Sequence, residues 1–197
     1  MVRREEREAA GLTPPTEYAN VKSLIARAEF FVVQPATKRP SSLDAADFLV
    51  IWCARPGESE SLYPGPRGGV IGALKKRGID PPEYPVVSAV GSRLALEYLV
   101  AWRARSGIAI KAAMSALTAR CRKWGITRPD LRAIGADLAI RSAKEAGLLN
   151  NDGQITSYRD KALRHGAPAE LPEQKLQQPE PAPLERKLDP RQPEPMP

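Results

Sequence analysis

The chain of 197 residues contains only one histidine and two cysteines. A structural zinc site needs clustered cysteine and histidine ligands, whereas Cys53 and Cys121 stand far apart in apolar surroundings. We therefore expect two buried thiols and no metal site. A Ser/His/Asp catalytic set would have to use His165, at the edge of a proline-rich tail. The sequence argues against both kinds of chemistry.

Long apolar runs and clustered carboxylates are missing as well. No window approaches the roughly 20 apolar residues of a membrane-spanning helix. The charged N-terminus has no apolar run after it, which argues against a signal peptide. We therefore expect a cytoplasmic protein without membrane insertion. The acidic residues of the body are scattered, which disfavours a metal-dependent nuclease site. The glycine-rich segment 64–69 (PGPRGG) lacks the GK[ST] ending of a P-loop and is interpreted as a mobile surface loop.

Residues 167–197 contain nine of the chain's 20 prolines and no aromatic residue. Such a segment cannot bury enough apolar surface to offset the entropy of ordering it, so we expect it to be disordered. Its six acidic and four basic residues give a net charge of −2, which hides a charge of +9 on residues 1–166.

The positive charge is concentrated between Arg67 and Lys144, where 15 Lys and Arg residues stand against five Asp and Glu residues. This excess favours an anionic partner, with nucleic acid first and an acidic protein or a membrane surface second. A basic protein kept soluble by its charge is the alternative.

The apolar pattern predicts an α/β (α+β) fold in a single domain. Residues 1–17 are expected to form a mobile arm, residues 18–107 a small mixed sheet with short helices, and residues 108–166 a helical half. Within the first part we expect a helix at 18–28 and another at 70–78. Strands are expected at 29–36, 48–53 and 84–90, from their β-branched, aromatic or continuously apolar character. Asp44 and Asp47, just before the second of these, could equally belong to a helical turn.

Residues 110–124 and 128–147 carry the helical signal most clearly. Apolar residues recur at steps of three and four in the first segment, and Thr127 followed by Pro129 and Asp130 is a good start for the second. Gly147 then predicts its end. The pair resembles a helix-turn-helix DNA reader in outline, but the second helix lacks a cluster of base-reading side chains. An αα-hairpin packed on the sheet is the simpler interpretation.

Gly91, Ser92 and Arg93 connect an expected strand to an expected helix. The first turn of a helix offers unpaired N–H groups and a positive dipole end, both of which suit a phosphate. Arg93 in that turn needs an anion nearby, which is either a ligand or the carboxylate of Glu97 one turn later.

The segment VIGALKKRGIDPPEYPVVSAVGSRLALEYL, residues 70–99, resembles the core of the ParB/sulfiredoxin-like superfamily. The shared features are the basic corner Lys75-Lys76-Arg77-Gly78, the strand at Pro85-Val86-Val87, and the glycine turn at Gly91-Ser92-Arg93. The resemblance implies a sheet of the ParB/sulfiredoxin type and nucleotide phosphate binding by the turn.

Within that superfamily the chain looks most like the Osa-type fertility-inhibition factors of conjugative plasmids. This similarity implies a plasmid-encoded protein that inhibits conjugative or T-DNA transfer through a type IV secretion system. Its partners would be DNA and a coupling protein or a relaxase–DNA complex. The type is associated with DNase and ATPase activity, which implies ATP or another nucleotide, and Mg²⁺, as cofactors.

If the protein is an enzyme, Arg93 and Glu97 are the best catalytic candidates. The alternative is a non-enzymatic DNA-binding regulator or adaptor that uses the helices of residues 110–147. The candidate DNA-binding residues are Lys75, Lys76, Arg77, Arg103, Arg105, Arg120, Arg122 and Lys123.

Overall fold

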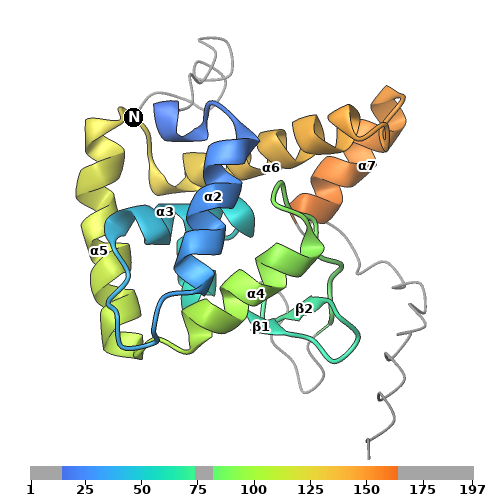
Figure 1. Ribbon diagram of the computed structural model, residues 1–197. Helices are drawn as coiled ribbons and strands as arrows, with labels where there is room; N and C mark the ends of the chain where they lie inside the picture. Colours follow the sequence, from blue (N-terminus) through green and yellow to red (C-terminus); the bar gives the residue numbers. More distant parts are fainter. Residues whose placement is uncertain (1–14, 74–81, 164–197) are drawn as a thin grey trace, which may run out of the picture.

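The computed structural model describes residues 15–73 and 82–163, and most of these residues lie in helices (Figure 1). The strands β1 (Tyr63–Pro64) and β2 (Val70–Ile71) pair antiparallel. The class is therefore α+β, in agreement with the sequence at this level. The helices of the described ranges are η1 (Thr16–Tyr18), α2 (Val21–Val32), α3 (Ser42–Ile51), η2 (Pro56–Glu60), α4 (Ser92–Arg103), α5 (Gly107–Lys123), α6 (Arg128–Glu145) and α7 (Asp152–Ala162).

Helix α3 forms the centre of the body and contacts α2, α5 and α6. Residues 45–51 are all buried, so this helix is covered on every side. Its start is fixed by a capping box. The Ser41 hydroxyl accepts from Asp44 N at 3.2 Å, and Ser41 N donates to the Asp44 carboxylate at 2.6 Å.

The strands expected at 29–36 and 48–53 are wrong. The first segment contains the end of α2, and the second contains the last turn of α3. In α2, Phe31 is buried while its neighbour Phe30 is 63% exposed. In α3, burial on all sides produces a continuous apolar run that periodicity cannot distinguish from a buried strand.

The sheet is also smaller than expected. Within the described ranges it has two strands, extended by one bridge between Val70 and Tyr84. Residues 85–90 form no strand, and the segment expected as a helix from Val70 begins with β2 instead. The remainder of that expected helix, most of the N-terminal arm and the proline-rich tail lie outside the described residues.

Stacked aromatic rings join α2, α3 and α4. Phe31 stacks on Tyr98 with ring centroids 4.5 Å apart, and Phe48 stacks on Trp102 at 4.8 Å. The polar atoms are paired as well, since Trp102 Nε1 donates to Ser59 O at 3.0 Å. This cluster fixes α4 across the other two helices.

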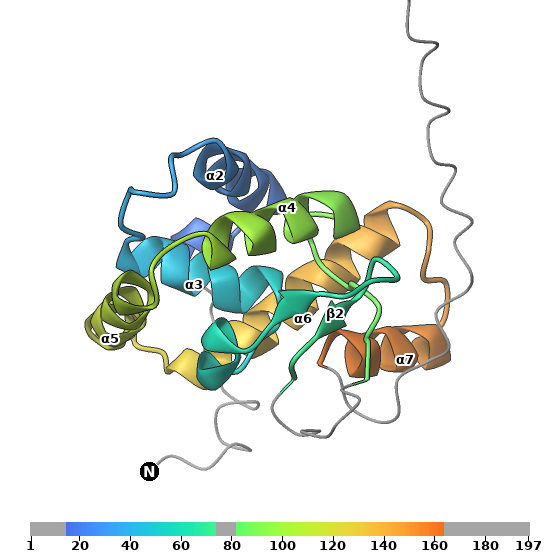
Figure 2. The ribbon, with the colours of Figure 1, turned by 90° about the horizontal axis from the view of Figure 1, so that it is seen from below.

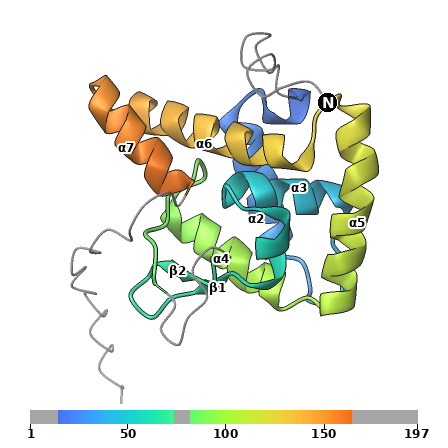
Figure 3. The ribbon, with the colours of Figure 1, turned by 180° about the vertical axis from the view of Figure 1, so that it is seen from behind.

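The helices expected at 110–124 and 128–147 are confirmed as α5 and α6. Each ends in a Schellman arrangement, with Gly125 and Gly147 in the left-handed region at φ 67° and 72°. Ile126 N donates to Cys121 O, and Leu148 N donates to Ala143 O. Figures 1 and 3 show α5 along one edge of the body and α6 extending from there to α7, and Figure 2 shows the same edge from below.

Candidate nucleic-acid interface

Gly91 places the start of α4 at the surface. Its φ of 82° is in the region that favours glycine, and it precedes α4 without a side-chain cap. Ser92 and Arg93 are exposed in the first turn. The predicted turn therefore presents the positive end of a helix dipole to solvent.

Arg93 is 92% exposed at its side chain and pairs with the residue one turn later. Its Nε donates to Glu97 Oε1 at 2.9 Å, and this contact raises the pKa of the Arg93 guanidinium. The structure thus brings the two predicted catalytic residues together. The pair also satisfies Arg93 without a ligand, which is the second of the two interpretations that the sequence left open.

Two of the predicted DNA-binding arginines hold the body together. Arg105 is 5% exposed and donates to Ala101 O, Phe31 O and Gln34 O, so it joins α4 to the end of α2. Arg103 donates to Glu60 O at 2.8 Å, and its guanidinium lies 4.0 Å from the ring centroid of Tyr63. Arg105 is therefore not accessible to DNA, and the guanidinium of the partly exposed Arg103 is already engaged by these contacts. Lys75, Lys76 and Arg77 lie outside the described residues.

The other three predicted residues gather at the C-terminal end of α5. Arg120 is half-buried, donates to Ser42 Oγ at 2.8 Å and lies over the Trp124 ring. Arg122 and Lys123 are exposed, and no carboxylate of the described residues pairs with either of them. Arg128 follows at the start of α6, five residues after the last residue of α5. We call Arg120, Arg122, Lys123 and Arg128 the basic end of α5.

Helix α6 is less suited than α5 to act as the recognition helix of a helix-turn-helix motif. Eight of its residues are buried against α3 and α7, including Leu131, Ile134 and Leu138. By contrast, Ser115, Thr118 and other residues on the outer face of α5 are exposed. Both helices have an exposed face, but that of α6 includes Asp137 and Glu145, whereas α5 contains no acidic residue. Of the two helices, α5 is therefore the better candidate for an anionic partner.

The glycine-rich loop 64–69 surrounds a carboxylate of the chain itself. Glu83 is 4% exposed and accepts from Gly69 N at 2.6 Å, from Arg67 N at 3.0 Å and from Arg67 Nε at 3.2 Å. A Cβ at Gly65 or Gly69 would come within 3 Å of the Glu83 side chain. The glycines therefore make room for Glu83, and this anion-binding loop has its anion already.

Two features escaped the sequence-based prediction. One is Glu83, whose role depends on contacts 14 or more residues away along the chain. The other is Arg128, which could have been found from the charge pattern. Residues 98–129 contain seven Lys and Arg residues and no Asp or Glu.

In the part of the chain that the structure describes, no three His, Cys, Asp or Glu side chains are placed to hold a metal ion. No helix in the same ranges has the length and apolarity required to cross a membrane. Comparison of the chain with protein-family models, with curated proteins and with solved structures gives no match.

Proposed function

We propose that this protein is DNA-directed and binds the phosphate backbone of DNA through the outer face and the basic end of α5. The observation that carries the proposal is the absence of acidic residues from 98–129, a segment whose exposed cations lie on one accessible helix. Carboxylates of other elements reach α5 at Glu60, 3.6 Å from Lys111 Nζ, and at Glu17, which accepts from Trp124 Nε1. Neither pairs with Arg122 or Lys123, so these two cations can attract a polyanion.

The chemistry of α5 favours backbone contact over the reading of base edges. The last turn supplies Arg122 and Lys123, and the exposed outer face has small side chains such as Ala112, Ser115 and Ala119. Small residues let a phosphate backbone approach closely, but they offer few of the bidentate contacts that recognise a base. Binding should therefore depend weakly on DNA sequence.

The biological role in this proposal comes from the resemblance to fertility-inhibition factors. The protein would act on the DNA–relaxase substrate of a type IV secretion system and so inhibit conjugative or T-DNA transfer. A relation to the ParB/sulfiredoxin fold belongs to the same proposal, with Gly91, Ser92 and Arg93 as the nucleotide phosphate site. The uncapped start of α4 supports that assignment.

Replacing Arg122 and Lys123 by alanine should weaken DNA binding strongly and reduce its salt dependence. If each residue neutralises one phosphate, the slope of log K against log salt concentration falls by about 1.8. At 0.1 M salt this corresponds to roughly 60-fold weaker binding. Fluorescence anisotropy with labelled duplexes of random sequence, at several salt concentrations, measures both quantities.

The matched control removes the same charge at the other end of α6. Arg141 and Lys144 are exposed, and no carboxylate of the described residues pairs with them. They lie about 20–25 Å along the helix from Arg128. Their double alanine variant should retain most of the affinity. Equal losses of DNA affinity in the two variants would show that only the net charge of the protein matters. Unchanged binding by the α5 variant would refute the proposed interface.

Replacing Arg93 by alanine tests the enzymatic part of the proposal. The side chain is exposed and pairs only within α4, so the midpoint of thermal unfolding should not change measurably. If the protein hydrolyses ATP or cleaves DNA through this turn, the variant loses that activity while it keeps its fold. Arg141→Ala is the control, and activity that persists in Arg93→Ala would place the chemistry elsewhere.

A non-enzymatic adaptor is the second candidate, and the exposed pair Arg122 and Lys123 also suits an acidic protein surface. The anisotropy experiment separates the two functions. An adaptor would show no binding to DNA at any salt concentration, whereas a sequence-specific regulator would prefer one duplex over random DNA by a factor on the order of a thousand.

A further inference from the structure

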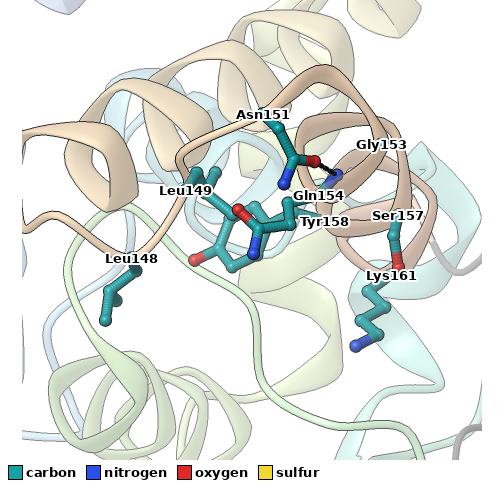
Figure 4. Close-up of a pocket in the computed structure, with 8 residues that line it drawn as sticks. All are labelled: Leu148, Leu149, Asn151, Gly153, Gln154, Ser157, Tyr158 and Lys161. Atoms are coloured by element: carbon teal, nitrogen blue, oxygen red, sulfur yellow. Dashed lines mark hydrogen bonds between the residues drawn. The ribbon is translucent and has the colours of Figure 1, made fainter.

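A cleft of about 530 Å³ lies beside α7, at the turn that joins α6 to α7. It is shallow and open to solvent over most of its extent. Leu148 and Leu149 provide an apolar wall, and one face of α7 provides Gln154, Ser157 and Lys161. None of the residues that line the cleft is acidic. Figure 4 shows the lining residues.

The amide oxygens in the cleft each accept one hydrogen bond already. Asn151 Oδ1 accepts from Gln154 N at 2.9 Å, which caps the start of α7. Gln154 Oε1 accepts from Asn150 N at 2.7 Å. Each oxygen keeps one further acceptor position, whereas the NH₂ groups of Asn151 and Gln154 make no hydrogen bond within the described residues, so donors are the larger unused share.

Three further donors in the cleft are unused. The Ser157 and Tyr158 hydroxyls make no hydrogen bond within the described residues, and Lys161 pairs with no described carboxylate. Burial raises the pKa of Tyr158, so its hydroxyl stays protonated. In Figure 4 the Tyr158 ring extends from α7 toward Leu149 and Leu148, and the Lys161 side chain lies next to Ser157.

These features favour an anionic ligand. The cleft has several hydrogen-bond donors, the positive charge of Lys161, an apolar wall and no carboxylate. An anion with a single tetrahedral group accepts separate donors from several directions, and lysine serves such a group as a point charge. A planar carboxylate is matched better by the fork of an arginine, which this cleft lacks. The apolar wall and the Tyr158 ring favour a ligand that also has an apolar or aromatic part.

We propose that this cleft binds a small phosphomonoester, with the phosphate between Lys161 and Ser157 and an aromatic or apolar group against Leu148 and Tyr158. The site is separate from the basic end of α5. A nucleoside monophosphate has both required parts and is the appropriate probe.

The experiment is a titration of the full-length protein with adenosine 5′-monophosphate, followed by NMR. Saturable shifts are expected at the amides of Ser157 and Lys161. Adenosine lacks the phosphate, and inorganic phosphate lacks the aromatic group. Each should bind about tenfold more weakly than the monophosphate, which is the effect expected from the loss of one charged hydrogen bond. The variant Lys161→Gln should weaken binding of the monophosphate to a similar degree.

Lys22→Gln, an exposed lysine on α2, is the matched control and should bind normally. Ser157→Ala provides a second variant in the cleft, with a smaller expected loss. The double variant Arg122→Ala/Lys123→Ala should bind the monophosphate normally, because the cleft is separate from the proposed DNA interface. The proposal is overturned if adenosine binds as well as its monophosphate, if Lys161→Gln binds normally, or if the shifts lie elsewhere. Binding of a 5′-phosphorylated oligonucleotide without binding of the monophosphate would also overturn it.

Discussion

Asp47→Ala is expected to lower the free energy of unfolding by about 3–5 kcal/mol, the cost of breaking a buried ion pair from one side. The Asp47 side chain is 2% exposed, and the Arg27 fork donates to both of its oxygens at 2.8 Å. The Tyr18 hydroxyl donates to the same carboxylate at 2.9 Å. Alanine would leave a half-buried guanidinium and a buried phenol without their acceptor.

The network is costly to break because it joins three elements. Tyr18 belongs to η1, Arg27 to α2 and Asp47 to α3. Burial raises the pKa of Asp47, and the hydrogen bonds from Arg27 and Tyr18 offset this effect only in part. The intact pair therefore adds little net stability, whereas its disruption exposes the full desolvation cost.

Chemical denaturation of three variants distinguishes this explanation from a general effect on α3. Asp47→Asn keeps the shape and one acceptor, so its loss should be smaller than that of the alanine variant. Asp44→Ala, in the capping box of the same helix, should cost about 1 kcal/mol. Equal losses for Asp44→Ala and Asp47→Ala would contradict the role assigned to the buried network.

The elements that were predicted correctly are those whose apolar periodicity and capping residues match their burial in the fold. Helices α5 and α6 are amphipathic or capped, and Gly125 and Gly147 end them as expected. Helix α3 was missed because burial on all sides removes periodicity, even though Ser41 and Asp44 form a readable capping box. The end of α2 was missed because Phe30 to Val33 favour a strand locally, while the aromatic contacts of Phe31 are made with α4.

The candidate site was predictable in part for a similar reason. Charge can be read from the sequence, so the basic segment and the Arg93–Glu97 pair were found. Whether a cation is free depends on tertiary contacts. These bury Arg105, and they engage the partly exposed Arg103 with Glu60 O and the Tyr63 ring. The same holds for Glu83, which acts as the anion of a loop that it reaches only after folding.

Gly135→Ala is expected to lower the free energy of unfolding by about 3 kcal/mol, at the upper end of the usual cost of overpacking. A Cβ at this position would lie 2.2 Å from Val50 O and 3.0 Å from Val50 C. These are backbone atoms of α3, so they can move away only if the two helices separate. Replacing glycine by alanine within a helix usually raises the free energy of unfolding by about 1 kcal/mol, whereas here the replacement should lower it.

Gly107→Ala is the matched control, because a Cβ there would meet no atom within 4 Å and the residue lies in the first turn of α5. This variant should be as stable as the natural chain or slightly more stable. Thermal unfolding should therefore show a lowered midpoint for Gly135→Ala and an unchanged or slightly raised midpoint for Gly107→Ala, although the chemical change is the same. The result also bears on the proposed interface, since Gly135 holds α6 against α3. If alanine were tolerated at 135, α6 would not be packed as described, and the preference for α5 over α6 as the DNA contact would fail with it.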